Sequence, residues 1–164
     1  MGKRRWLALS LLPLLIPQFD LTAAETVRSI PKGTVLFLCP HGGAKSVIAA
    51  SYFNRLAEEL ELPWSAVAAA ADDPYDSVPA PVAAFLADEG FDVLSFKPRR
   101  VETSDVKMAT RVVSIDCDLG CVTVPGVSIE RWDDVPKVSV DLEASAAAIR
   151  LHVSTMLAEL SERH

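Results

Sequence analysis

The order of apolar and polar positions along the chain predicts strands that alternate with helices. Short apolar runs, typical of strands covered on both faces, occur at Thr34–Leu38 (TVLFL), Trp64–Ala71 (WSAVAAAA) and Arg111–Ile115 (RVVSI). A fourth candidate strand lies within Cys121–Ile129, around Pro125 and Gly126.

Helical periodicity separates these runs. A helix is predicted from Ser46 to near Pro63, because its apolar residues fall four apart at Ile48, Tyr52 and Leu56. The last predicted helix has the clearest pattern, with spacings that alternate between four and three. Its apolar positions are Leu142, Ala146, Ile149, Val153, Met156 and Leu160.

Two shorter helices are predicted between the strands. One is capped by Asp76 or Ser77 and ends at Gly90, and the other is capped by Thr103 or Ser104 and continues through Met108. This alternation predicts an α/β fold, a single three-layer domain whose open, parallel, four-stranded sheet has helices on both faces.

Ligands of such sheets bind at the carboxyl ends of the strands. Cys39, the DDPYDS turn (72–77) and the DCDLGC segment (116–121) each follow a predicted strand. We therefore expect all three at the same edge of the sheet, with Tyr75 at the wall of a pocket beside Cys39.

The first 24 residues have the form of a signal peptide. Three basic residues at positions 3–5 precede the apolar stretch Trp6–Ile16, and small residues follow up to Ala24. The apolar stretch is shorter than the roughly 20 residues that span a bilayer. We predict cleavage after Ala24, which leaves a domain of residues 25–164 exported to a bacterial periplasm and in contact with a membrane only transiently, through the leader.

Charge and cysteine content narrow the possible functions. Removing the leader changes the net charge from −6 to −8, and an acidic balance disfavours nucleic acid as a partner. An odd number of cysteines (Cys39, Cys117 and Cys121) leaves at least one thiol outside an internal disulfide. Together with His41 they lack the spacing of a standard zinc site, so we predict no metal and no other cofactor.

The stretch CPHGGAKS joins the first strand to the first helix. Gly42 and Gly43 allow close approach of the backbone to a ligand, and the helix that starts near Lys45 directs its unpaired N–H groups toward Cys39. Such a loop predicts an anion site, and the same field favours a thiolate at Cys39.

These residues resemble the C-x5-R-[ST] signature of the low-molecular-weight protein tyrosine phosphatase superfamily, which includes thioredoxin-coupled arsenate reductases. The resemblance implies that Cys39 is the nucleophile, that Ser46 steadies its thiolate and that Lys45 replaces the arginine of the signature. It also implies an anion-binding loop of Pro40, His41, Gly42, Gly43 and Ala44.

Members of this superfamily form a cysteinyl-phosphate and use an aspartate on a late loop as the general acid. The matching segment here is WDDVP, in which Asp134 is favoured over Asp133, although Val135 stands between them and the proline. Asp73 directly precedes Pro74 but comes too early in the chain, and a capped turn is the simpler interpretation of that segment.

The resemblance therefore implies a phosphomonoester hydrolase that acts on a phosphorylated small molecule or a phosphoprotein and is weakened by Lys45. One alternative is an arsenate-reductase-like thiol relay through Cys117 and Cys121, which also have the spacing for a small structural disulfide. The other is a module that binds an oxyanion without turnover.

Overall fold

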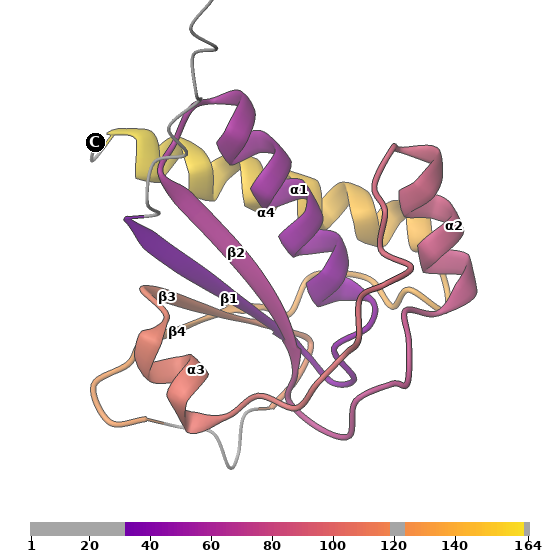
Figure 1. Ribbon diagram of the computed structural model, residues 1–164, viewed down its shortest axis with the longest axis horizontal. Helices are drawn as coiled ribbons and strands as arrows, with labels where there is room; N and C mark the ends of the chain where they lie inside the picture. Colours follow the sequence, from indigo (N-terminus) through magenta and orange to yellow (C-terminus); the bar gives the residue numbers. More distant parts are fainter. Residues whose placement is uncertain (1–31, 119–123, 163–164) are drawn as a thin grey trace, which may run out of the picture.

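The computed structural model describes residues 32–118 and 124–162, so the predicted leader and Cys121 lie outside the described residues. Four parallel strands form an open sheet in the order β2-β1-β3-β4 (Figure 1). They are β1 (Gly33–Cys39), β2 (Trp64–Ala70), β3 (Arg111–Ile115) and β4 (Ile129–Trp132). The α/β fold predicted from the sequence is confirmed.

Helices cover both faces of the sheet (Figure 1). The helices α1 (Lys45–Glu59), α2 (Ala80–Asp88) and α4 (Leu142–Glu162) lie over one face, and α3 (Thr103–Met108) lies over the other. Side chains alternate along β1, so Phe37 packs with Phe53 and Trp132 on the first face while Leu36 packs with Val106 on the second.

The fourth strand and two helix caps differ from the prediction. The fourth strand is Ile129–Trp132 rather than a segment around Pro125 and Gly126, because proline has no N–H for a ladder and Gly126 turns the chain at φ +86°. The helix α2 begins at Ala80 after an N-cap at Pro79, so neither Asp76 nor Ser77 caps it. The helix α3 is capped by Glu102 rather than by Thr103 or Ser104, because Glu102 forms a reciprocal capping box with Asp105.

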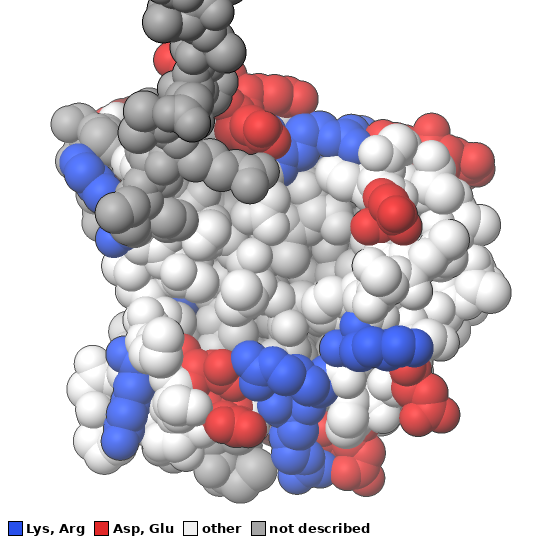
Figure 2. All heavy atoms as spheres, viewed as in Figure 1, with Lys and Arg blue, Asp and Glu red and all other residues white. Residues whose placement is uncertain are grey.

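The strand β1 lies between β2 and β3, so its carboxyl end is the place where a site can form. Cys39 pairs in register with Ala70 of β2, and β3 ends on the other side of β1, so the loops after all three strands meet. Figure 2 shows acidic and basic side chains adjacent to each other along the rim of one face, around an area of uncharged side chains. None of the helices in the described ranges has the length and apolarity to cross a membrane.

Candidate active site

Cys39 ends β1 with its sulfur next to a hydroxyl. Its Sγ lies 3.1 Å from Oγ of Ser46, in the first turn of α1, and both residues are buried. When the sulfur is ionised, Ser46 donates this hydrogen bond and stabilises the negative charge. The structure thus brings together the predicted nucleophile and the hydroxyl predicted to steady it.

The loop between Cys39 and α1 has its carbonyl groups bound and its amides available. The carbonyls of Cys39, Pro40 and His41 accept hydrogen bonds from the loop after β2, at 2.8 to 3.1 Å. Among the backbone hydrogen bonds of the described residues, none has an N–H of residues 41–46 as its donor. Unpaired amides at the start of a helix form an anion site.

Gly42 and Gly43 allow this loop to pass close to its neighbours. Gly42 has φ +66°, and a Cβ there would lie 2.7 Å from the backbone nitrogen of Ala70 in β2. A Cβ at Gly43 would lie 3.0 Å from the ring of Tyr75. Gly42 is therefore required both by its conformation and by its closeness to β2, whereas at Gly43 the packing against Tyr75 leaves little room for a side chain.

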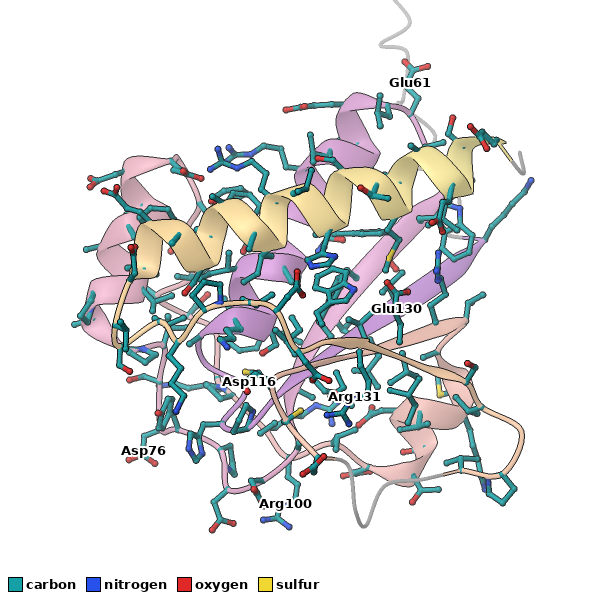
Figure 3. The ribbon with its side chains drawn as sticks, turned by 180° about the vertical axis from the view of Figure 1, so that it is seen from behind. Glu61, Asp76, Arg100, Asp116, Glu130 and Arg131 are labelled. Carbon is teal, nitrogen blue, oxygen red and sulfur yellow. The ribbon has the colours of Figure 1, made fainter. Side chains whose placement is uncertain are left out.

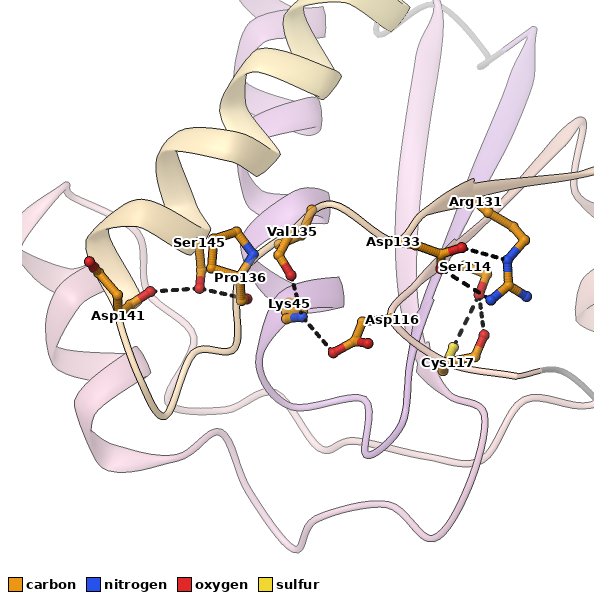
Figure 4. A network of polar contacts seen from close by, with 10 residues as sticks. All are labelled: Lys45, Ser114, Asp116, Cys117, Arg131, Asp133, Val135, Pro136, Asp141 and Ser145. Atoms are coloured by element: carbon orange, nitrogen blue, oxygen red, sulfur yellow. Dashed lines mark hydrogen bonds and ion pairs between the residues drawn. The ribbon is translucent and has the colours of Figure 1, made fainter.

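Lys45 is buried and has two protein partners. Its Nζ donates to Oδ2 of Asp116 and to the carbonyl oxygen of Val135, each at 3.0 Å (Figure 4). An ammonium has three N–H donors, so one remains for a further acceptor. Asp116 follows β3 and Val135 follows β4, so Lys45 links the ends of both strands to α1.

These groups meet at a cavity of about 490 Å³ at the carboxyl edge of the sheet. Its charged, polar and nucleophilic lining includes Cys39, His41, Lys45, Tyr75, Asp116 and Lys137, and its apolar lining includes Pro40, Ala44, Pro79, Pro81, Val82 and Val138. Figure 3 shows Asp116, Asp76 and Arg100 toward this end of the molecule and Glu61 at the other end. Cys39, Tyr75 and Asp116 thus share this edge, as predicted, while residues 119–121 of the DCDLGC segment lie outside the described residues.

His41 and Tyr75 form one wall of this cavity. Their rings lie 4.6 Å apart, and Nδ1 of His41 lies 2.8 Å from the carbonyl oxygen of Asp73. The Tyr75 side chain remains partly exposed. The DDPYDS turn therefore supplies an aromatic wall beside Cys39, as predicted.

Asp134 is not part of the cavity lining. Its carboxylate accepts a hydrogen bond from Nε2 of His152 at 2.9 Å, and the His152 ring stacks on Trp132. His152 is consequently half-buried. Asp134 as the general acid remains a prediction, and in this structure its carboxylate is bound to His152 instead.

Cys117 is buried beside the site without lining it. The Ser114 hydroxyl donates to the Cys117 carbonyl at 2.6 Å, and its Oγ lies 3.4 Å from the Cys117 sulfur. Burial raises the pKa of the Cys117 thiol, and negative charge on Cys39 raises it further. The predicted redox pair remains a prediction, because Cys121 is outside the described residues.

Two residues of the cavity lining, Asp116 and Lys137, were not predicted individually as site residues, although the segment 116–121 was expected at this edge. Asp116 is the first residue after β3, at the edge where ligands bind, and that position was a usable signal. No feature of the sequence marked Lys137, because only the path of the chain after β4 brings it to the cavity. No group of three or more possible metal ligands occurs in the described part of the chain.

The comparisons with known proteins agree with this geometry. No family model matches the chain, and no curated protein matches its sequence. Among solved structures, YfkJ from Bacillus subtilis superposes with a TM-score of 0.72 at 19% identity, over 82% of this chain and 97% of that one. The tyrosine phosphatase Wzb from Escherichia coli K30, in complex with sulphate, gives 0.65 at 10% identity, over 78% and 98%. An arsenate reductase from Archaeoglobus fulgidus gives 0.56 at 26% identity, over 76% and 98%.

The chain has the fold of the low-molecular-weight phosphatase and arsenate reductase superfamily. The resemblance noted in the CPHGGAKS loop is therefore confirmed at the level of the fold. Within this fold the loop after β1 lies at the cavity, and the correspondence of Lys45 to the signature arginine stays a prediction.

Proposed function

We propose that the protein is a cysteine-dependent phosphomonoester hydrolase. The observation that carries the proposal is the position of Cys39, at a cavity, 3.1 Å from the Ser46 hydroxyl and under a loop whose amides have no internal acceptor. The Cys39 thiolate attacks phosphorus, the bond to the ester oxygen breaks, and that oxygen leaves with the electron pair. Water then attacks phosphorus, the S–P bond breaks, and the thiolate is restored.

The loop stabilises the charge that develops on the phosphoryl oxygens. The amides of residues 41–46 and the remaining N–H of Lys45 are donors fixed before the substrate arrives. A lysine offers fewer donors than the forked guanidinium of arginine. Turnover is accordingly expected to be slow.

The hydrolysis rate of a substrate is expected to depend on whether its leaving group needs a proton. While Asp134 is bound to His152 outside the cavity lining, its carboxyl group does not protonate a leaving group at Cys39. An ester whose leaving group departs as a stable anion, such as p-nitrophenyl phosphate, is therefore hydrolysed much faster than phenyl phosphate. The natural substrate is a phosphorylated small molecule or a phosphoprotein.

The test is hydrolysis of p-nitrophenyl phosphate by the purified chain and two cysteine variants. Cys39→Ser abolishes release of p-nitrophenol, whereas Cys117→Ser, which removes a buried thiol outside the cavity, retains it. Activity that persists in Cys39→Ser contradicts the proposal. Loss of activity in both variants, with intact folding, also contradicts it, because turnover would then need both thiols.

A second candidate is oxyanion binding without turnover. It is favoured by Lys45, which already has two protein partners, and by the Asp134 carboxylate, which has another partner. Phosphate binding with no p-nitrophenol released by either the wild type or Lys45→Arg supports this candidate.

A thiol relay is the third candidate, and it is favoured by the position of Cys117, two residues after β3 and so beside the end of β1 that carries Cys39. In a relay, Cys39 binds arsenate with loss of water, and a second thiol then attacks the Cys39 sulfur, so that a disulfide forms as As(V) becomes As(III). Arsenate-dependent oxidation of a dithiol reductant, lost in Cys117→Ser or Cys121→Ser, supports it.

A further inference from the structure

Asp116 gives the cavity a feature that simple anion attraction does not explain. It is the one carboxylate in the cavity lining formed by the described residues. Oδ2 accepts from Lys45 at 3.0 Å, and no described residue donates to Oδ1. The side chain is 45% exposed, so the second oxygen is within reach of a ligand in the cavity.

The backbone holds Asp116 at this position. It has φ +52°, in the left-handed region that side-chain-bearing residues other than asparagine, aspartate and histidine seldom occupy. It directly follows Ile115, which is buried at the end of β3. Aspartate is one of the few residues with a side chain that tolerates this conformation, so the turn after β3 can present a carboxylate at the ligand edge.

The pair formed by Asp116 and Lys45 changes the charge that an oxyanion meets. The carboxylate offsets the ammonium, so the remaining attraction comes from the loop amides and from the third N–H of Lys45. A carboxylate only accepts hydrogen bonds, and it repels an oxyanion that has only lone pairs to offer. An oxyanion with an O–H group donates to the same carboxylate instead.

We propose that Asp116 makes the cavity selective for tetrahedral oxyanions that carry a proton, such as hydrogen phosphate or hydrogen arsenate, over sulfate. The inference rests on the proposed oxyanion site at Cys39 and adds the discriminating group. The other titratable side chains of the cavity are Cys39, His41, Lys45, Tyr75 and Lys137. None of the five is a carboxylate that accepts this proton in place of Asp116.

Phosphate and sulfate are a matched pair for testing this selectivity. At about pH 8 both carry about two negative charges on a tetrahedral group of similar size, and only phosphate has a proton to donate. A charge-assisted hydrogen bond is worth roughly 1.5–3 kcal/mol, which corresponds to a preference of about tenfold to hundredfold.

The experiment is calorimetric titration of the full chain with sodium phosphate and with sodium sulfate at equal ionic strength. The wild type is expected to bind phosphate at least about tenfold more tightly than sulfate. Asp116→Asn, whose amide donates to sulfate, is expected to lose this preference mainly by gaining affinity for sulfate. Asp118→Asn is the matched control, because Asp118 is exposed and pairs with Arg131 outside the cavity lining.

The outcomes separate this inference from the proposed function. Equal affinities in the wild type, or an unchanged preference in Asp116→Asn, overturn the role of Asp116 and leave the oxyanion site standing. A wild type that binds neither anion overturns both. If Asp116→Asn does not fold, as judged by circular dichroism, Asp116→Gly is the second variant, since glycine suits φ +52°.

Discussion

The sulfur of Cys39 lies 3.1 Å from the hydroxyl oxygen of Ser46. The two residues belong to different elements, the end of β1 and the first turn of α1, and the loop between them is the predicted anion site. This contact orients the thiolate toward the cavity and stabilises its charge.

Ser46→Ala removes the hydrogen bond and leaves the helix intact. We expect alkylation of Cys39 by iodoacetamide near neutral pH to slow by about tenfold, because one charge-assisted hydrogen bond to the thiolate is lost. Peptide mass spectrometry of the alkylated protein measures the rate at this cysteine. The control is Ser51→Ala, a change of the same kind in the same helix but outside the cavity. Equal rates in the two variants would contradict the role of Ser46.

Gly42→Ala tests the shape of the loop. Its Cβ strains a residue at φ +66° and meets the backbone of Ala69 and Ala70, so we expect a loss of more than about 2 kcal/mol of unfolding free energy and loss of phosphate binding. Gly126→Ala is the control, because Gly126 has φ +86° with nothing within 4 Å of the added atom. It isolates the conformational strain, at about 1 kcal/mol.

Urea unfolding followed by circular dichroism compares the two glycine variants. The difference between their unfolding free energies measures the contact with β2 alone. If Gly42→Ala matches Gly126→Ala and still binds phosphate, the close approach of the loop to β2 is not required.

Lys45→Arg is expected to raise the rate of p-nitrophenyl phosphate hydrolysis. A guanidinium has five N–H donors, so it can keep Asp116 and Val135 as partners and still bind two phosphoryl oxygens. The gain is about tenfold to hundredfold in kcat/KM if both added bonds form in the transition state. Lys45→Met lowers the rate strongly, whereas Lys137→Met, at the edge of the same cavity, has a smaller effect. Similar losses in the two methionine variants would contradict a special role for Lys45.

Asp105→Ala tests stability away from the site. Hydrogen bonds from Arg99 lower the pKa of Asp105, whose carboxylate also accepts from the Glu102 N–H at the start of α3. Because the pKa is lower in the folded than in the unfolded chain, the stabilisation is present above about pH 4 and is lost as the pH falls through the folded value.

We therefore expect Asp105→Ala to cost about 1 kcal/mol of unfolding free energy at pH 7 and less at about pH 3. Urea unfolding at the two pH values measures it. Asp88→Ala, at the exposed end of α2, is the control and should stay within about 0.5 kcal/mol of the wild type at pH 7. A cost for Asp105→Ala that is the same at both pH values would rule out the ionised carboxylate as its cause.

The sequence predicted those strands and helices whose buried residues recur as a run or at a regular spacing. The apolar run of β1 and the helical spacing of α4 correspond to buried positions, so both elements were located closely. The edge strand β4 was misplaced because IERW contains two charged residues that pair outside the core, Glu130 with Arg111 and Arg131 with Asp133.

The site was predictable only where it is local in sequence. Cys39, Ser46 and the loop between them are within eight consecutive residues, so their motif is visible. Lys45 and Asp116 are 71 residues apart, and only the adjacent ends of β1 and β3 bring them together. The partner of Asp134 was also not predictable, because it depends on how α4 packs against β4.

The most direct test of Cys39 as the nucleophile is to trap the covalent intermediate. The full chain is mixed with p-nitrophenyl phosphate, quenched in alkaline detergent and digested, and the peptide that contains Cys39 is weighed by mass spectrometry. We expect the mass of one added phosphoryl group on Cys39, and none on the same peptide from the Cys39→Ser variant. Release of p-nitrophenol by a wild type whose Cys39 never carries phosphate would contradict it.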